Sequence, residues 1–137
     1  MTNLNTIDNK ISAVRMYLGD VEEYKKYSQE EIEINPGIRF ALERILYLIT
    51  QASIDLGEIL IAYKKLRKPG NQSEIFQILK EKNVITRHLE EKLIAMTGFR
   101  NVIAHDYAKI DYAKVYKVLH EGLKDIEEFI KLAGKIT

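Results

Sequence analysis

The sequence predicts an all-α protein, a bundle of four long helices plus a short helix in a single domain that covers residues 1–137. Apolar residues recur at spacings of three and four along most of the chain, which is the periodicity of an amphipathic helix. Both prolines fall between these periodic segments, where a helix can begin or end. No segment alternates apolar and polar residues well enough to compete as a strand.

The first helix is expected over about residues 5–27. Its apolar residues share one face at four-and-three spacing: Ile7, Ile11, Val14, Leu18 and Val21. The polar segment SQEEIEIN, residues 28–35, follows, and we expect it to be an extended connection. Asn35 and Pro36 then predict the start of the second helix, because asparagine caps a helix and proline fits its first turn.

The second helix, about residues 37–66, is the longest and the most apolar of the expected helices. One stripe of residues repeats at strict four-and-three spacing: Ala41, Ile45, Leu48, Ala52, Asp55, Ile59, Ala62 and Leu66. A neighbouring stripe widens the expected buried face: Leu42, Leu46, Ile49, Leu56, Leu60 and Tyr63. Two adjacent apolar stripes predict a helix that is contacted on more than one side, in a bundle or at a dimer interface.

The rest of the chain holds a turn, a short helix and two long helices. The segment RKPGNQS, residues 67–73, is typical of a turn. A short helix is expected over about residues 73–81, with Ser73 as its cap. Thr86 opens the next helix and Asp111 caps the last one. The helix after Thr86 has a stripe of five residues: Leu89, Leu93, Met96, Arg100 and Ile103.

Composition excludes several classes of protein. The chain has no cysteine, so disulfides, thiolate zinc sites and cysteine nucleophiles are ruled out. The formal net charge of +1 gives no global attraction to nucleic acid, so any RNA contact must come from a local patch. The first residues lack the basic start and apolar core of a signal peptide. No apolar run approaches the roughly 18 residues that span a bilayer, so we expect a cytoplasmic protein with no membrane partner.

Asp55 and Arg100 each occupy a stripe position that the periodicity reserves for an apolar residue. An unpaired buried charge costs several kcal/mol, so something must compensate for it. Two interpretations stay open. The two residues form a structural ion pair between helices, or both face a wet crevice or a symmetric interface that forms a site.

Gly57 lies inside the second helix, two residues after Asp55. A glycine in a helix costs roughly 1 kcal/mol relative to alanine, so we expect a packing reason for it. The close approach of another helix is the simplest one. Glu58 either belongs to the same polar pocket as Asp55 or is solvated.

The segment TGFRNVIAHDYAKID, residues 97–111, concentrates polar side chains near the end of a helix. Five of them fall within eight positions: Arg100, Asn101, His105, Asp106 and Tyr107. On a straight helix Asn101 and His105 share a face, whereas Arg100 and His105 are about 140° apart. One straight helix therefore does not close a compact site around both. Either the helix unwinds after Ile103, or a second copy of the chain completes the pocket, which favours a dimer.

This set of side chains suits phosphodiester cleavage. The guanidinium of Arg100 matches a phosphate and can neutralise charge that develops in the transition state. His105 can act as a general base or acid, typically worth about 10² to 10⁴ in rate. On RNA such chemistry needs no metal, because the 2′-hydroxyl is an internal nucleophile. The more common alternative, from these residues alone, is that Arg100 and His105 interact with the helix C-terminus.

A metal site is a poor alternative, and we expect no cofactor. The chain has three histidines, His88, His105 and His120, and lacks an HExxH motif. No carboxylate pair lies beside His105 in the sequence. We assign His88 and His120 to surface or core packing.

The string RNVIAHDY, residues 100–107, preceded by TGF and set between two helices, resembles the Arg-x4-His-x-Tyr signature of HEPN-domain proteins. The match is closest to the HepT-like toxin branch. The likeness also covers the second helix, the stretch EIFQILKEKNVI and the final helix. The resemblance implies a HEPN-type up-down bundle that forms a homodimer, with motif residues from both subunits lining a cleft. It also implies a metal-independent endoribonuclease toxin of a type II toxin–antitoxin pair, acting on tRNA or mRNA.

The resemblance assigns roles to five residues. Arg100 would grip the scissile phosphate, His105 would transfer protons and Asn101 would support them. Asp55 matches an acidic position of the family's second helix and would orient Arg100 or bound RNA. Tyr107 matches the tyrosine to which a partner MNT-type nucleotidyltransferase attaches AMP, silencing the toxin. The added anionic phosphate would repel RNA from the site, although Tyr107 packing at the helix end is the simpler interpretation.

Two competing functions remain at this point. One is a non-catalytic HEPN interaction or regulatory module that binds a nucleotidyltransferase partner, which a near-zero net charge also suits. Equal toxicity of His105→Ala and wild type would favour that module over the enzyme. The other is a nucleotide-binding helical domain beside a transferase, which is disfavoured because the chain has no glycine-rich phosphate loop.

Overall fold

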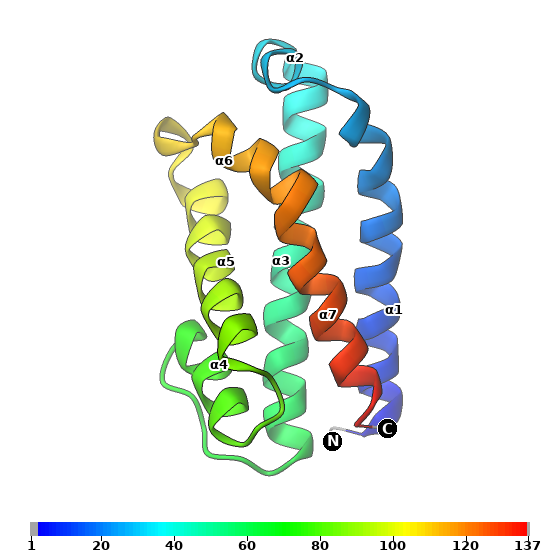
Figure 1. Cartoon of the computed structure of the whole chain (residues 1–137), viewed down its shortest axis with the longest axis vertical. Coiled ribbons are helices and arrows are strands. Elements are labelled where there is room, and N and C mark those ends of the chain that lie inside the picture. The colour runs from blue at the N-terminus through cyan, green and yellow to red at the C-terminus, as the bar shows by residue number, and fades with distance from the viewer. Residues whose placement is uncertain (1–2, 137) are drawn as a thin grey trace.

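The computed structural model describes residues 3–136, apart from the side chain of Tyr107, as an all-α bundle (Figure 1). Three long helices are α1 (Leu4–Val21), α3 (Pro36–Tyr63) and α5 (Arg87–His105). The fourth is a continuous helical segment formed by α6 (Tyr112–Lys117), a π-helical turn (Val118–Gly122) and α7 (Leu123–Gly134). Shorter elements are the 3₁₀ turns Glu22–Lys26 and Tyr107–Lys109 and the helices α2 (Gln29–Ile34) and α4 (Gln72–Glu81). The predicted fold class is confirmed.

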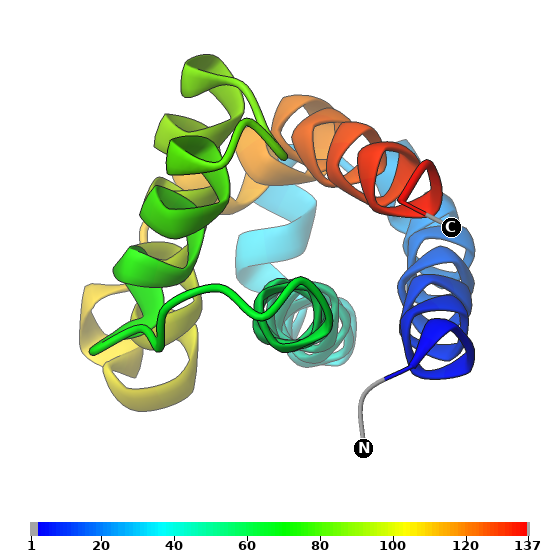
Figure 2. The same ribbon diagram turned by 90° about the horizontal axis from the view of Figure 1, so that it is seen from below.

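The four long helices enclose one core, which is clear when the bundle is seen end on (Figure 2). α3 packs against α1, α4 and α5, and α7 closes the ring by packing against α1 and α5. The motif end of α5 lies at the same end of the bundle as α2, α6 and the start of α3, whereas α4 lies at the other end (Figure 1). This arrangement brings the start of α3 beside the end of α5.

From the periodicity, the strict four-and-three stripe is expected to be the main buried face of α3. The structure instead buries the neighbouring stripe more deeply. Leu42, Leu46, Ile49, Leu56 and Leu60 are fully buried, so the neighbouring stripe forms the core. Most of the strict four-and-three stripe lies at the rim, with Ile45, Leu48 and Ile59 only partly buried and Ala62 exposed. Ala52 is a buried member of this stripe. Asp55 and Arg100 are likewise partly exposed. They are therefore rim charges rather than charges buried in the core.

α3 is long and apolar enough to cross a membrane by length and composition, which our interpretation of the sequence overlooked. Its most apolar 18-residue window has a mean hydropathy of 1.5. In the bundle 56% of that window is buried, and α1, α4 and α5 pack against the helix. These are the surroundings of a core helix.

Residues 29–34 form α2, so the prediction of an extended connection is wrong. Ser28 and Glu31 form a capping box: the Ser28 hydroxyl accepts a hydrogen bond from the Glu31 N–H at 3.1 Å. The Glu31 carboxylate in turn accepts one from the Ser28 N–H at 3.0 Å. The hydrogen bonds from the backbone and side chain of Ser28 lower the pKa of Glu31. Ile32 is the buried residue of this short helix and packs into the core.

The remaining helix starts agree with the predicted caps, with one exception. The side chains of Asn35, Thr86 and Asp111 accept hydrogen bonds from the first turns of α3, α5 and α6. α4 starts one residue earlier than predicted, because the cap is Asn71 rather than Ser73. The Asn71 side-chain oxygen accepts a hydrogen bond from the Glu74 N–H at 2.9 Å.

Gly57 has the packing reason that the sequence predicts. A Cβ atom at this position would lie 2.6 Å from Cγ2 of Ile75. Ile75 belongs to α4, so α4 approaches α3 closely at this glycine. Glu58 is exposed, which favours the solvated interpretation.

Candidate functional site

Arg100 lies near the end of α5 and is held by three neutral partners. Its Nε donates a hydrogen bond to Oε1 of Gln51 at 2.8 Å. Its Nη1 donates to Oδ1 of Asn101 at 3.0 Å, and its Nη2 donates to the hydroxyl of Tyr47 at 3.3 Å. The guanidinium carbon also lies 5.1 Å from the centroid of the Tyr47 ring, a cation–π contact. The positive charge is thus fixed in position, and no described side chain forms a direct ion pair with it.

Asp55 reaches Arg100 only through Gln51. The Gln51 Nε2 donates a hydrogen bond to Oδ1 of Asp55 at 2.8 Å, one helical turn along α3. The other carboxylate oxygen, Oδ2, lies 3.7 Å from Nζ of Lys10 on α1. Within residues 3–136 no ion pair joins Asp55 to Arg100 directly, so the interpretation of a structural ion pair between them is wrong.

Gln51 is a site residue that the sequence analysis missed. It belongs to neither apolar stripe of α3, and a lone glutamine carries no motif. A signal was present in its spacing, because residues four apart on a helix are neighbours and a glutamine there can bond an aspartate. Only the packing of α5 against α3 reveals that the amide oxygen of Gln51 accepts a hydrogen bond from Arg100.

His105 is the last residue of α5, so the helix does not unwind after Ile103. The histidine is exposed and lines a pocket of about 420 Å³ between α3 and α5, which we call the histidine pocket. Its lining residues are Phe40, Glu43, Arg44, Tyr47, Ile103, Ala104 and His105. Arg100 does not line this pocket, as the helical geometry predicts. Tyr47 links the two, because it lines the pocket and binds Arg100.

Glu43 is a buried carboxylate in the wall of the histidine pocket and was also missed. Its side chain is on α3 and the residue is only 4% exposed. One oxygen, Oε2, accepts a hydrogen bond from the hydroxyl of Tyr112 at 3.0 Å. Burial, with the hydrogen bond to Glu43 and its negative charge, raises the pKa of Tyr112 to about 12. The other oxygen, Oε1, is buried and has no hydrogen-bond partner among the described residues.

The remaining motif residues surround the end of α5. Asn101 is exposed and accepts the hydrogen bond from Arg100. Asp106 follows the last helical residue, and its carboxylate lies 3.5 Å from Nζ of Lys109. The backbone of Tyr107 begins the 3₁₀ turn Tyr107–Lys109, but its side chain lies outside the described part of the structure. Its role as a modification site therefore stays a prediction.

The other two histidines lie outside the histidine pocket. His88 is exposed, with Nε2 3.8 Å from a carboxylate oxygen of Asp125. The ring of His120 packs against that of Tyr116, with centroids 4.3 Å apart, and its buried Nε2 has no hydrogen-bond partner among the described residues. Among residues 3–136, no group of three or more histidine, aspartate and glutamate side chains could hold a metal ion.

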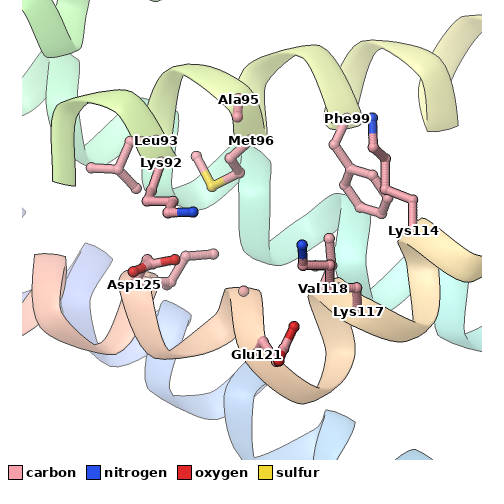
Figure 3. Close-up of a pocket in the computed structure, with 12 residues that line it drawn as sticks. Lys92, Leu93, Ala95, Met96, Phe99, Lys114, Lys117, Val118, Glu121 and Asp125 are labelled. Carbon is pink, nitrogen blue, oxygen red and sulfur yellow. The ribbon is translucent and has the colours of Figure 1, made fainter. Parts of the chain in front are cut away.

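A larger pocket of about 560 Å³ lies between α5 and the final helical segment (Figure 3). Apolar side chains from α5 face it, including Leu93, Met96 and Phe99. Charges of both signs surround it: Lys92, Lys114, Lys117, Glu121 and Asp125. None of the predicted site residues whose side chains the structure describes lines it, so the candidate site is the surface around Arg100 and the histidine pocket.

The sequence profile of the family described as ribonuclease HepT-like matches residues 14–133. This chain belongs to the HepT-like ribonuclease family. The matched segment includes Gln51, Asp55 and the whole Arg-x4-His-x-Tyr motif. The candidate site of this HepT-like chain therefore lies within the region that matches the family profile.

Relatives of similar length support this membership. The HepT-like chain is 26% identical over 130 residues to the mRNA nuclease HepT of Shewanella oneidensis, covering 95% of this chain and 92% of that protein. It is 25% identical over 133 residues to the tRNA nuclease HepT of Aphanizomenon flos-aquae, covering 96% and 90%.

The fold is that of a HEPN toxin. The structure of the tri-AMPylated Shewanella oneidensis HEPN toxin in complex with its MNT antitoxin matches the HepT-like chain with a TM-score of 0.87. That match has 24% sequence identity and covers 94% of this chain and 96% of the toxin chain.

Proposed function

We propose that this HepT-like protein is a metal-independent endoribonuclease that acts as the toxin of a type II toxin–antitoxin pair in the cytoplasm. The observation that carries the proposal is the geometry of Arg100, which is fixed by neutral groups beside the pocket that holds His105. Support also comes from the relatives named as an mRNA nuclease and a tRNA nuclease. The substrate is RNA, as tRNA or mRNA.

Arg100 binds the scissile phosphate in this proposal. A guanidinium has five N–H donors, and three of those on Arg100 are used by Gln51, Asn101 and Tyr47. One N–H remains on each terminal nitrogen, which is the pair that a phosphate accepts in a bidentate contact. Because the partners are neutral, the full positive charge is available to stabilise the charge that builds up as the phosphodiester is cleaved.

His105 transfers protons in the same step. Its exposed position lets RNA reach the imidazole, a group that can accept and donate a proton. The imidazole takes the proton from the 2′-hydroxyl, whose oxygen attacks the neighbouring phosphorus. The bond from phosphorus to the 5′-oxygen breaks, and the leaving oxygen takes up a proton from the solvent. The products carry a 2′,3′-cyclic phosphate and a 5′-hydroxyl. Arg100 and His105 point in different directions on one helix. In a homodimer, Arg100 of one subunit and His105 of the other can face the same RNA.

A nucleotidyltransferase of the MNT type is the proposed antitoxin, and Tyr107 is its target. The tri-AMPylated relative in complex with its MNT antitoxin supports this assignment. Tyr107 opens the turn that directly follows α5, two residues after His105. AMP attached there would add phosphate charge near the motif end of α5 and compete with the RNA phosphate.

One observation favours a non-catalytic interaction module as the second candidate function. Two large apolar side chains, Ile34 and Phe40, are 69% and 57% exposed. They belong to α2 and the start of α3, and Phe40 lines the histidine pocket. Exposed apolar residues of this kind suit a protein contact, and a partner that covered them would also cover the pocket.

Cleavage of total tRNA and of a test mRNA in EDTA distinguishes these candidates. Wild type should produce fragments with 2′,3′-cyclic phosphate ends, whereas Arg100→Ala and His105→Ala should not. His88→Ala is the matched control, because His88 is an exposed histidine outside the site. Equal activity of all four proteins would identify a contaminating nuclease. No activity in wild type, with unmodified Tyr107 by mass spectrometry, would favour the interaction module.

A further inference from the structure

The histidine pocket contains a buried acceptor that nothing in the described protein satisfies. Tyr112 occupies Oε2 of Glu43 at 3.0 Å and leaves Oε1 without a donor. Buried polar atoms without partners are rare in folded proteins, and each calls for a functional or structural reason. Glu43 lines the pocket beside His105, so the missing donor is one that the pocket's ligand can bring.

The other walls of the pocket suit a flat aromatic ligand. Phe40 is 57% exposed, and the pocket also includes the ring of Tyr47. The guanidinium carbon of Arg44 lies 5.3 Å from the centroid of that ring. Aromatic rings and guanidinium planes are the surfaces on which unpaired RNA bases stack. A carboxylate is the side chain that accepts a hydrogen bond from the amino group of a base.

We propose that the histidine pocket binds one unpaired base of the RNA, next to the phosphate held by Arg100, and that Oε1 of Glu43 accepts a hydrogen bond from the exocyclic amino group of that base. This assignment rests on the proposed nuclease function, because it names the part of the RNA that lies beside His105. Oε1 is buried in the unbound protein, so the carboxylate of Glu43 must turn towards the base for the hydrogen bond to form. The broad χ3 torsion of glutamate allows this rotation.

The proposal predicts a preference between bases of equal size. Cytosine offers an amino group where uracil has a carbonyl oxygen, and the same exchange separates adenine from hypoxanthine. A carbonyl oxygen facing the carboxylate of Glu43 would be repelled, so cytidine and adenosine are favoured over uridine and inosine at this position.

Glu43→Gln should reverse this preference. In the variant the amide oxygen can accept the hydrogen bond from Tyr112, which leaves the amide NH₂ at the position of Oε1. An acceptor thus becomes a donor, and a base with a carbonyl becomes the better partner. Tyr112→Phe is the matched control, because it removes the other hydrogen bond of Glu43 and leaves the carboxylate unchanged.

The test is cleavage of a randomised single-stranded RNA library, followed by sequencing of the ends. Wild type and Tyr112→Phe should share a cytidine-over-uridine preference at one position beside the cut. Glu43→Gln should lower that ratio at least tenfold. An identical preference in wild type and Glu43→Gln would overturn the inference and leave Glu43 as a partner of Tyr112 only.

A binding measurement separates failure of this inference from failure of the proposed function. Short oligocytidine and oligouridine are titrated by fluorescence anisotropy into the His105→Ala protein, with and without Glu43→Gln. Tighter binding of oligocytidine that is lost with Glu43→Gln supports the base pocket even if wild type cleaves no RNA. Equal affinities for the two oligonucleotides in both proteins refute it, including when Glu43→Gln proves inactive. Circular dichroism verifies that each variant is folded.

Discussion

Gln51 connects the carboxylate of Asp55 to Arg100 through an uncharged amide. A carboxylate in the place of Gln51 would hold Nε equally well, but it would neutralise the guanidinium on which phosphate binding depends. The amide orients Arg100 and keeps its charge, while Asp55 fixes which way the amide points. Gln51 is therefore a positioning residue in the proposed reaction.

Replacing Gln51 with glutamate should separate orientation from charge. The side chains have the same shape, so Gln51→Glu should still fold, but its melting temperature should fall because the hydrogen bond to Asp55 is replaced by a contact between two carboxylates. RNA cleavage should fall by roughly 10²-fold, comparable to the loss of one charge-stabilising donor in other active sites. The measurement is kcat/KM on a defined RNA, with Gln77→Glu as a control because Gln77 is an exposed glutamine on α4. Full activity of Gln51→Glu would contradict this role.

Tyr112 should make the stability of the protein depend on pH above its ordinary titration range. Its pKa is raised from 10.0 to about 12 by burial and by Glu43, so the folded state holds the proton longer than the unfolded state. The stabilising effect is complete below pH 10 and is lost as the pH rises through 12. The melting temperature of wild type should fall more steeply between these values than that of Tyr112→Phe. Parallel pH profiles of the two proteins would show that Tyr112 has no such effect.

At the scale of single elements, the contact between α3 and α4 depends on the absence of one methyl group. A Cβ on Gly57 would lie 2.6 Å from a buried methyl of Ile75, which is too close without movement of the helices. At Gly98, on α5, a Cβ atom would meet no described atom within 4 Å outside its adjoining residues and the backbone of its own helix. These two helical glycines form a matched pair.

The two glycine-to-alanine substitutions should change stability in opposite directions. Gly57→Ala should lower the free energy of unfolding by about 1–3 kcal/mol through overpacking. Gly98→Ala should raise it by about 0.5–1 kcal/mol, because alanine favours the helix. Urea denaturation monitored by circular dichroism measures both. A stabilised Gly57→Ala protein would mean that α4 can move away from α3 without loss.

At the scale of the whole molecule, α5 remains helical to His105, so one subunit presents Arg100 and His105 in different directions. A site that combines the two residues from different subunits predicts complementation. Refolding Arg100→Ala together with His105→Ala should restore up to roughly a quarter of wild-type cleavage, because half of the dimers are mixed and each has one intact site. Each variant alone should stay inactive. No recovery in mixtures with verified heterodimers would place the complete site within one subunit.

The bundle follows from features that are local in the sequence, whereas the site does not. Periodicity and the caps at Asn35, Thr86 and Asp111 predict the long helices, because these signals depend on neighbouring residues. Even the capping box of α2 was present in the sequence as Ser28 and Glu31, three residues apart.

Which stripe of α3 is buried depends on where α1, α4 and α5 pack, and that information is not local. The same limit explains why Arg100, His105 and Asp55 could be proposed from the motif and its resemblance. Gln51, Tyr47 and Glu43 could not, because each has a contact in the site with a residue that is distant in the sequence.

The π-helical turn Val118–Gly122 has a consequence for the length of the last helix. A π turn accommodates one residue more than the α-helix around it. Deleting exposed Glu121 would allow a regular α-helix through this segment, and the residues after it would keep nearly the same orientation relative to α6. Ile126 and Phe129 would then still face the core that they fill. The final helix can therefore be shortened by one residue at this turn, whereas a deletion in a regular α-helical turn would rotate everything after it by about 100°.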